Sequence, residues 1–284
     1  RQGGNIPALW ARAQGANTRL VGLSSLDEFH GLVVRGEDPA LSVLDLRGRC
    51  VALPLYGGAI DARRVEALNA VVRCLAHVGL TLGDVSLVDV PADRAWIPSP
   101  HQRLAHGLFG EYARQIGALL RRQVDIIYVK GARGLQAAAS AQARVLVDLR
   151  DHPDPGARVH SGTPRPITVD AGLLRHYPEV VERFLARVLA VEAWAGKHPW
   201  ETAGYLARES RCHDGYVRQA YGDNVHTRMA THLAPGAVQV LKQQLALLDQ
   251  WGHVKAPFDI DAWIDPQPLQ RAQARLAAGL LTVE

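Results

Sequence analysis

The chain opens on a short cationic turn whose residue types suit the binding of an anion. Arg1 is followed by Gly3 and Gly4, and a helical pattern begins directly after them. Glycines let backbone N–H groups approach a ligand closely, and the free N–H groups of a helix N-terminus favour a phosphate, sulfonate or carboxylate. The Arg1 guanidinium would add a planar fork of donors with a permanent charge. The alternative is a frayed terminus followed by Asn5 as a helix N-cap.

Other candidate anion contacts follow two of the expected strands. Tyr56 precedes the glycine pair Gly57 and Gly58 at a predicted helix start, and Tyr128 and Lys130 close a later strand. In open α/β sheets ligands bind beyond the carboxyl ends of strands, which makes all five residues candidate ligand contacts. The alternatives are ordinary packing for the two tyrosines and a solvated surface charge for the lysine.

Strand and helix patterns alternate over the first 150 residues, which predicts an α/β fold with parallel sheets. Beyond residue 166 the pattern becomes helical, with Pro178, Pro199 and Pro235 each suited to a first helical turn. This order indicates two lobes, one built from both ends of the chain. The expected strands are residues 18–23, 30–35, 50–55, 85–90, 124–129 and 144–149, and the expected helices among them are 6–13, 61–78 and 108–120.

Two long loops, residues 91–107 and 150–166, are expected to act as a lid or a hinge. They hold four histidines, which we expect to be exposed to solvent because a zinc site needs a further ligand at recognisable spacing. These are His101, His106, His152 and His160.

The composition indicates a globular protein with a substantial core. Of 284 residues, 48% are hydrophobic and 21% are charged, which excludes disordered and fibrous classes. No apolar run reaches the ~18 residues that span a bilayer. The net charge of +4 comes without a basic stripe, so nucleic acid is not an expected partner.

Three cysteines are too few and too irregularly spaced for a disulfide framework or a metal site. Cys50 and Cys74 fall in apolar segments and are expected to be core residues. Cys212 has a polar context, and a surface thiol is favoured over a nucleophile. We predict neither a metal nor a cofactor.

Several segments resemble one known family. Residues 45–53 with the glycine pair that follows look like the entry to the second lobe of the sulfonate, taurine and nitrate substrate-binding proteins of ABC transporters, and Val124-Asp125-Ile126 with Tyr128 continues the match. Segments similar to that family's closing helices are residues 177–184, 198–201, 250–255 and 263–266.

This resemblance implies a two-lobed periplasmic-binding-protein type 2 fold, each lobe a doubly wound sheet, with a helical C-terminal tail. We expect residues 1–47 and 150–284 in the first lobe and residues 48–149 in the second. Because a strand and helix would normally precede the Gly3-Gly4 turn, the sequence is expected to be a fragment that lacks one N-terminal unit of roughly 30 residues.

A narrower resemblance concerns the aromatic sulfinate desulfinases, which share this fold and cleave a carbon–sulfur bond. It rests on the segment from Arg1 to Gly4, on residues 6–9, and on the insertion before Leu108-Phe109-Gly110. It implies that Arg1 and Gly4 hold a sulfinate. The family's nucleophilic cysteine and assisting histidine lie upstream of this motif, so no catalytic residue is predicted within the chain.

Two functions follow from these resemblances. The expected one is a monomeric periplasmic substrate-binding protein that takes a small organosulfur or similar oxyanion between its lobes and delivers it to an ABC-transporter permease. The alternative is a desulfinase-like hydrolase, cytoplasmic, with its catalytic cysteine and histidine upstream of this chain. A biosynthetic enzyme of the pyrimidine-precursor type lacks support, because no clustered histidine and cysteine set is present.

Overall fold

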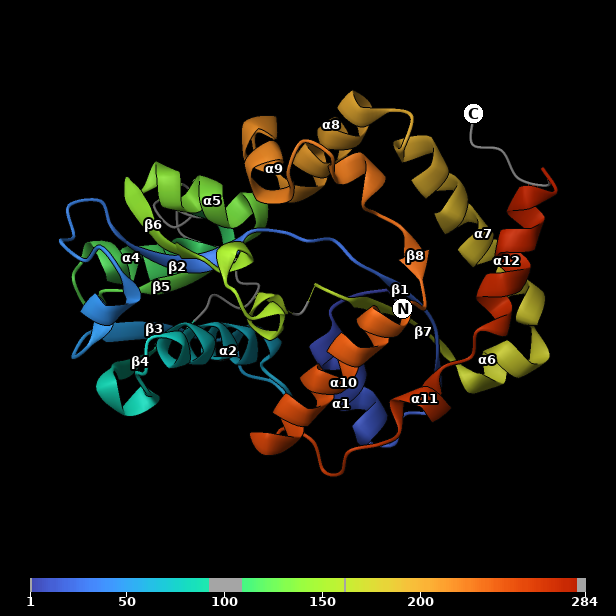
Figure 1. Cartoon of the computed structure of the whole chain (residues 1–284), viewed down its shortest axis with the longest axis horizontal. Helices are drawn as coiled ribbons and strands as arrows, with labels where there is room; N and C mark the ends of the chain where they lie inside the picture. Colours follow the sequence, from blue (N-terminus) through green and yellow to red (C-terminus); the bar gives the residue numbers. More distant parts are fainter. Residues whose placement is uncertain (1, 92–108, 161, 280–284) are drawn as a thin grey trace. The chain divides into compact units, whose positions relative to one another are not determined.

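The structure of the chain is a computed structural model that describes residues 2–91, 109–160 and 162–279. The chain folds into two compact units (Figure 1). Unit 1 comprises Arg1–Asp27, Ser161–Gly204 and Asp223–Glu284, and unit 2 comprises Glu28–His160 and Tyr205–Gly222.

Unit 2 is built on a mixed group of strands. β2 (His30–Arg35) lies between β5 (Ile127–Lys130) and β6 (Ala143–Asp148) and runs antiparallel to both. β3 (Cys50–Leu55) pairs in parallel with β4 (Ser86–Pro91), and a bridge from Val51 to Ile126 joins β3 to the start of β5. The expected parallel pairing therefore holds for β3 and β4, whereas β2 reverses direction between its neighbours.

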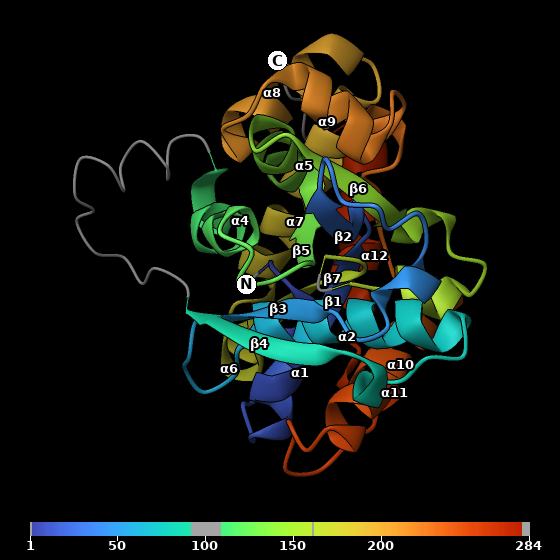
Figure 2. The same cartoon turned by 90° about the vertical axis from the view of Figure 1, so that its left-hand side faces the viewer.

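Helices cover both faces of these strands (Figure 2). α2 (Ala62–His77) presents Val71 and Leu75 to Leu32 and Leu53 of the sheet, all within one buried cluster. Burial of such side chains contributes roughly 1.5–3 kcal/mol each. α4 (Ala113–Leu120) and α5 (Gly131–Ser140) pack on the other face, and α9 (Asp214–Tyr221) packs against α5.

Unit 1 has an antiparallel sheet in which β1 (Thr18–Ser24) pairs with both β7 (Arg165–Asp170) and β8 (Thr231–His232). Val21 and Ile167 of this sheet pack against Val181 and Leu185 of a long helix. The helices of this unit are α1 (Asn5–Ala13), α6 (Ala171–His176), α7 (Pro178–Ala195), α10 (Pro235–Gln250), α11 (Ile260–Trp263) and α12 (Gln267–Ala277); α8 (Pro199–Ser210) begins in unit 1 and ends in unit 2.

The three prolines predicted to begin helices do begin α7, α8 and α10. Short 3-10 turns complete the described elements. They are η1 (Val43–Leu46), η2 (Leu82–Asp84), η3 (Gly110–Tyr112), η4 (Leu149–Asp151), η5 (Pro155–Arg158) and η6 (Val225–Thr227).

Two local predictions were wrong. Asn5 is the first residue of α1 and not its N-cap, because its buried side chain donates a hydrogen bond to the Pro164 carbonyl. His152 and His160 are buried and not exposed, because η4 and η5 fold the polar 150–160 segment back onto α2 and β2. The other loop, with His101 and His106, lies outside the described residues.

The grouping of residues also differs from the expected boundaries at 47/48 and 149/150. Residues 28–47 fall in unit 2 because β2 pairs with β5 and β6, and residues 205–222 fall there because α9 packs on α5.

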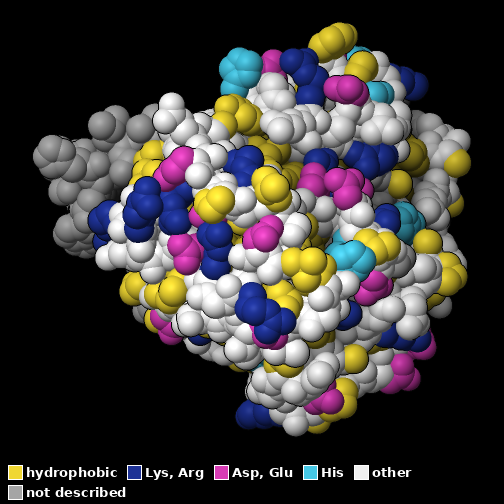
Figure 3. Space-filling view, turned by 60° about the vertical axis from the view of Figure 1, so that its left-hand side comes forward, with side chains coloured by type: hydrophobic (Ala, Val, Ile, Leu, Met, Phe, Trp, Pro, Cys, Tyr) yellow, Lys and Arg dark blue, Asp and Glu magenta, His cyan; other side chains and the backbone are white. Residues whose placement is uncertain are grey.

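Among the described helices, none has the length and apolar character to cross a membrane. Lys and Arg side chains alternate with Asp and Glu over the face in Figure 3.

Candidate functional site

The predicted N-terminal contacts lie at the start of α1 in unit 1. Gly4 is the N-cap of this helix, and its first turn holds no acidic residue. Gln2 bridges to Ile167 of β7, which fixes the strand-like entry to the turn. Gly3 and Gly4 therefore stand directly ahead of a helix N-terminus, as the anion cradle requires. Arg1 lies outside the described residues.

The Tyr56-Gly57-Gly58 turn already holds a carboxylate. Asp61, the N-cap of α2, accepts hydrogen bonds at Oδ2 from the N–H groups of Tyr56 (2.6 Å) and Gly57 (3.0 Å), and at Oδ1 from Arg64 N–H (3.2 Å). Gly58 has φ +110°, which L side chains rarely adopt. The turn is thus shaped to bind an anion, and an internal side chain occupies its donors.

The Tyr56 ring faces a charged pair beyond β3. The Arg63 guanidinium carbon lies 5.5 Å from the ring centroid, and Arg63 Nη1 lies 2.6 Å from Glu111 Oε1. The Tyr56 hydroxyl donates to the Glu111 carbonyl (3.4 Å). This aromatic and guanidinium pair forms a partly exposed surface at the carboxyl end of β3.

Lys130 ends β5 and is held between two buried carboxylates. Its Nζ lies 2.9 Å from Glu66 Oε1 and 3.4 Å from Glu28 Oε1. The Tyr112 hydroxyl accepts from the Lys130 N–H (3.0 Å) and donates to its carbonyl (3.1 Å). The Lys130 charge is therefore balanced within the protein.

His160 completes this group. Its Nδ1 lies 3.7 Å from both Glu28 Oε1 and Glu66 Oε1, and its side chain is 1% exposed. We call Glu28, Glu66, Lys130 and His160 the Lys130 cluster. Of these four residues, the sequence analysis names only Lys130 as a candidate ligand contact and predicts His160 to be an exposed loop residue. Glu66 carried a signal that could have been read, because it stands among the core-facing residues of α2.

Two further polar side chains lie next to the Lys130 cluster. The His30 ring lies 4.8 Å from the His160 ring and 6.2 Å from the Tyr128 ring. Both His30 ring nitrogens and the Tyr128 hydroxyl are buried and have no hydrogen-bond partner among the described residues. Burial first, and then the charge of His160, lowers the pKa of His30 to about 3. Burial raises the pKa of Tyr128 well above 10. Both side chains are thus neutral near pH 7.

Known proteins that this chain resembles include a sulfinate desulfinase and a sulfonate-binding protein. The chain is 27% identical to a 2'-hydroxybiphenyl-2-sulfinate desulfinase of Rhodococcus erythropolis over 97% of this chain and 80% of the relative. A mutant of DSZB in complex with biphenyl-2-sulfinic acid superposes with TM-score 0.77 and 26% identity, over 97% of this chain and 85% of that one. A putative periplasmic sulfonate-binding protein from Methylobacillus flagellatus superposes with TM-score 0.71 and 17% identity, over 96% and 74%. No family model matches the chain.

The chain has the fold of the type 2 periplasmic binding proteins. Among proteins with this fold, it resembles the aromatic sulfinate desulfinases. The α/β fold with its helical C-terminal region confirms the fold predicted from the sequence.

Within this superfamily fold, unit 2 gathers its polar groups at one edge of the strands. Tyr56 follows β3 and Lys130 ends β5, so both stand at carboxyl ends, while His30 begins the antiparallel β2 opposite Lys130. This is the edge at which open α/β sheets bind ligands. The five predicted unit 2 contacts therefore lie along the expected edge, with Tyr128 buried and Lys130 partly buried beside Glu28 and Glu66.

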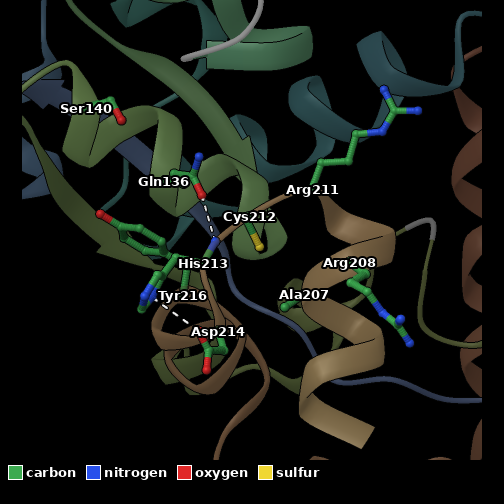
Figure 4. Close-up of a pocket in the computed structure, with 9 residues that line it drawn as sticks. All are labelled: Gln136, Ser140, Ala207, Arg208, Arg211, Cys212, His213, Asp214 and Tyr216. Atoms are coloured by element: carbon green, nitrogen blue, oxygen red, sulfur yellow. Dashed lines mark hydrogen bonds and ion pairs between the residues drawn. The ribbon is translucent and has the colours of Figure 1, made fainter. Parts of the chain in front are cut away.

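A separate surface pocket of unit 2 surrounds Cys212 (Figure 4). The Cys212 side chain points away from the His213 ring, and His213 donates its N–H to Gln136 Oε1 (3.0 Å). Burial raises the pKa of the Cys212 thiol, which opposes formation of the nucleophilic thiolate. Among the described residues no group of three or more His, Cys, Asp or Glu side chains could hold a metal ion.

Proposed function

We propose that the protein binds an aromatic organosulfur oxyanion and cleaves its carbon–sulfur bond, as an aryl sulfinate desulfinase does. The observation that carries this proposal is the similarity to the desulfinases, which extends over 97% of this chain. The sulfonate-binding protein shares the fold at lower identity, 17% against 26% for the DSZB mutant. This favours the enzyme, the alternative in the sequence analysis, over the transport receptor.

The proposed anion contacts in unit 1 are Arg1, Gly3 and Gly4. A guanidinium fork and the donors at the start of α1 would hold the sulfinate oxygens and stabilise charge that develops on them. In unit 2 the proposed surface is formed by Tyr56 with Gly57 and Gly58, whose ring offers an apolar face to an aryl group. Tyr128 would stabilise this edge by packing in the interior of unit 2, and Lys130 would do so through its ion pairs with Glu28 and Glu66.

The proposed reaction consumes water. A cysteine thiolate attacks the sulfinate sulfur, the carbon–sulfur bond breaks, and the aryl carbon takes a proton to give the arene; water then releases hydrogen sulfite and restores the thiol. The cysteines of this sequence do not suit this role. Burial raises the pKa of Cys74 to about 12 and also raises that of Cys212, and Cys50 lies within β3. We therefore propose that residues upstream of Arg1 supply the nucleophilic cysteine and its assisting histidine.

A transport receptor is the second candidate, favoured by the TM-score of 0.71 to the sulfonate-binding protein. It would bind an alkanesulfonate or a similar oxyanion in the periplasm as a monomer and present it to a membrane permease. Binding of this kind requires donors and a closed site but no nucleophile.

One assay separates the two candidates. The protein expressed from its complete coding region is incubated with biphenyl-2-sulfinate, and sulfite and biphenyl are measured together with calorimetric binding of sulfinate, alkanesulfonate and nitrate. Equal release of sulfite and biphenyl supports the desulfinase. Tight binding of alkanesulfonate without sulfite release supports the receptor, and failure to bind any of the three overturns both.

The anion cradle has its own test in the same protein. Arg1→Ala is expected to weaken sulfinate binding by about 10- to 100-fold, because a charge-assisted hydrogen bond contributes about 1.5–3 kcal/mol. Arg175→Ala, in the last turn of α6, is the matched control and should bind as the unmodified protein does. Equal affinity of the two variants would remove Arg1 from the proposed site.

A further inference from the structure

Two buried polar side chains of unit 2 lack the hydrogen bonds that buried polar groups normally make. His30 begins β2 and is 1% exposed, and Tyr128 lies in β5 and is 5% exposed. Neither the two ring nitrogens of His30 nor the Tyr128 hydroxyl has a hydrogen-bond partner among the described residues. Such groups lower the stability of a fold, and proteins retain them where they have a role outside folding. The pair therefore points to a ligand.

The strand register places both side chains on one face of the sheet. In the antiparallel pairing of β2 with β5, His30 is opposite Lys130. Leu32 is opposite Tyr128, so Tyr128 and His30 are diagonal neighbours on the same face. Their ring centroids lie 6.2 Å apart, with an interplanar angle of 76°. Leu32 and Tyr128 belong to the buried cluster that contains Val71 of α2, so the pair lies on the face that α2 covers.

The pair is next to the surface proposed above for the aryl group. β5 is a neighbour of β3, because the Ala52 N–H donates to the Ile126 carbonyl (2.9 Å) just ahead of β5. Tyr56 follows β3 and Tyr128 stands near the end of β5, so the two side chains belong to adjacent strand ends, and adjacent strands are about 4.8 Å apart. Arg63 lies over the Tyr56 ring, and its charge is also within electrostatic reach of Tyr128. A substituent on a ring bound at Tyr56 can therefore reach the Tyr128 hydroxyl.

The chemistry of the pair suits an uncharged hydroxyl group. Burial, and then the charge of His160, lowers the pKa of His30 to about 3, and burial raises the pKa of Tyr128 well above 10. A neutral imidazole has one donor and one acceptor nitrogen, and a phenol hydroxyl both donates and accepts. A ligand hydroxyl can donate to the imidazole acceptor and accept from Tyr128. A charged substituent would lose its hydration between two neutral groups, which is costly.

We propose that His30 and Tyr128 form a specificity site that binds a hydroxyl group on the ring system of the aryl sulfinate. This inference rests on the proposed function, since it requires an aryl group at Tyr56. Both side chains are closed to solvent, so the hydroxyl enters when the edge of the sheet opens and is then fully desolvated. A buried hydrogen bond of this kind discriminates between ligands that carry the hydroxyl and ligands that lack it.

Binding of matched ligands tests the specificity site. In the protein expressed from its complete coding region, calorimetry compares biphenyl-2-sulfinate with its three derivatives that carry one hydroxyl at the 2', 3' or 4' position of the distal ring. We expect one derivative to bind about 10- to 100-fold more tightly than the parent compound, because its hydroxyl pairs buried groups that otherwise have no partner. Tyr128→Phe and His30→Leu should each reduce this preference to within about threefold.

Tyr112→Phe is the matched control. Tyr112 is also a buried tyrosine of unit 2, but its hydroxyl is hydrogen-bonded to the Lys130 backbone. Tyr112→Phe should therefore lower the stability to urea and keep the hydroxyl preference, whereas Tyr128→Phe should lose the preference without a loss of stability. A preference that survives in both Tyr128→Phe and His30→Leu, or that disappears in Tyr112→Phe as well, would overturn the assignment.

The parent compound separates failure of this inference from failure of the proposed function. If biphenyl-2-sulfinate binds and no hydroxylated derivative binds more tightly, the specificity site is overturned and the proposed function stands. If none of the four compounds binds, both are overturned. A hydroxyl preference that depends on His30 and Tyr128, found without release of sulfite, would support the specificity site and overturn only the desulfinase reaction.

Discussion

The Lys130 ammonium lies 2.9 Å from the Glu66 carboxylate, inside unit 2, and not free at its surface. Lys130, which the sequence suggests as a cation for a ligand at the end of a strand, therefore balances the charge of a buried carboxylate instead. An anionic ligand would have to compete with Glu66 and Glu28 for it. Lys130 thus stabilises the edge of the sheet through its ion pairs with Glu28 and Glu66. A ligand at this edge would have to bind through other hydrogen-bond donors.

Removal of the Lys130 charge is expected to destabilise the protein strongly. Lys130→Met removes the cation that lies 2.9 Å from Glu66 and 3.4 Å from Glu28, both buried, and should lower the free energy of unfolding by about 3–5 kcal/mol, measured by urea denaturation. Lys242→Met is the matched control, because the Lys242–Asp261 pair, also close at 2.6 Å, is solvent-exposed. Such exposed pairs contribute about 1 kcal/mol or less. Similar losses for the two variants would mean that Lys130 is effectively solvated.

His30 should make the protein less stable in mild acid. The pKa of His30 falls from 6.5 to about 3 on folding, chiefly through burial. Between these values the unfolded chain binds a proton that the native protein does not, so the free energy of unfolding decreases as pH falls, by up to about 1.4 kcal/mol per pH unit from this residue. His30→Leu should flatten the stability curve from pH 6.5 towards pH 4.

The control for His30 is His176→Leu, at an exposed position in the last turn of α6. Chemical denaturation at a series of pH values measures both. Because neither ring nitrogen of His30 has a hydrogen-bond partner in the described part of the chain, His30→Leu should stay within about 1.5 kcal/mol of the unmodified protein in its stability at pH 7. A stability curve as steep in His30→Leu as in His176→Leu would contradict a neutral buried His30.

The Asp61 carboxylate is predicted to secure the turn after β3. Asp61→Ala removes the acceptor of three N–H groups at the start of α2 and is expected to cost about 1–2 kcal/mol in thermal or urea unfolding. Asp170→Ala, which removes the acceptor of one N–H at the start of α6, should cost less. The reverse order would show that the turn is stable without its internal anion.

Strand positions could be predicted from the sequence because apolar runs are local signals. The run at residues 30–35 gave the bounds of β2 without error, and Pro178 marked the start of α7. The antiparallel direction of β2 could not be read, since both of its partners are distant in the chain. Strand direction depends on the whole topology and not on the run itself.

In the candidate site too, residues marked by a local pattern could be predicted, and contacts between distant parts of the chain could not. Tyr56, Gly57 and Lys130 were found because they follow strand signals, but the partner Glu66 stands 64 positions from Lys130 and has no local mark of that contact. The sequence predicts an exposed His160, because it lies in a long loop with no further ligand at the spacing of a zinc site, whereas tertiary packing buries it. Local patterns thus give the edge of the sheet, and the three-dimensional fold decides which charges meet there.

Asp125 is expected to contribute to unfolding in acid. Burial acts to raise its pKa, but hydrogen bonds from the Cys50 N–H (3.0 Å) and from Arg35 Nη2 (3.0 Å) outweigh burial and hold the pKa below its ordinary value. The native carboxylate therefore binds a proton less tightly than the unfolded one. Its contribution is complete above about pH 4 and is lost as pH falls through the lower native pKa.

Asp125→Asn should remove that dependence on pH. The variant is expected to lose about 1–3 kcal/mol at pH 7, because a charged acceptor of two hydrogen bonds becomes neutral, and to lose less than the unmodified protein on further acidification to pH 2. Asp223→Asn, at an exposed position after α9, serves as the control and should keep the original acid profile. Urea midpoints at pH 7, 4, 3 and 2 measure the difference. If the two variants lose stability in parallel between pH 4 and pH 2, the Cys50 and Arg35 hydrogen bonds do not favour the ionised form of Asp125.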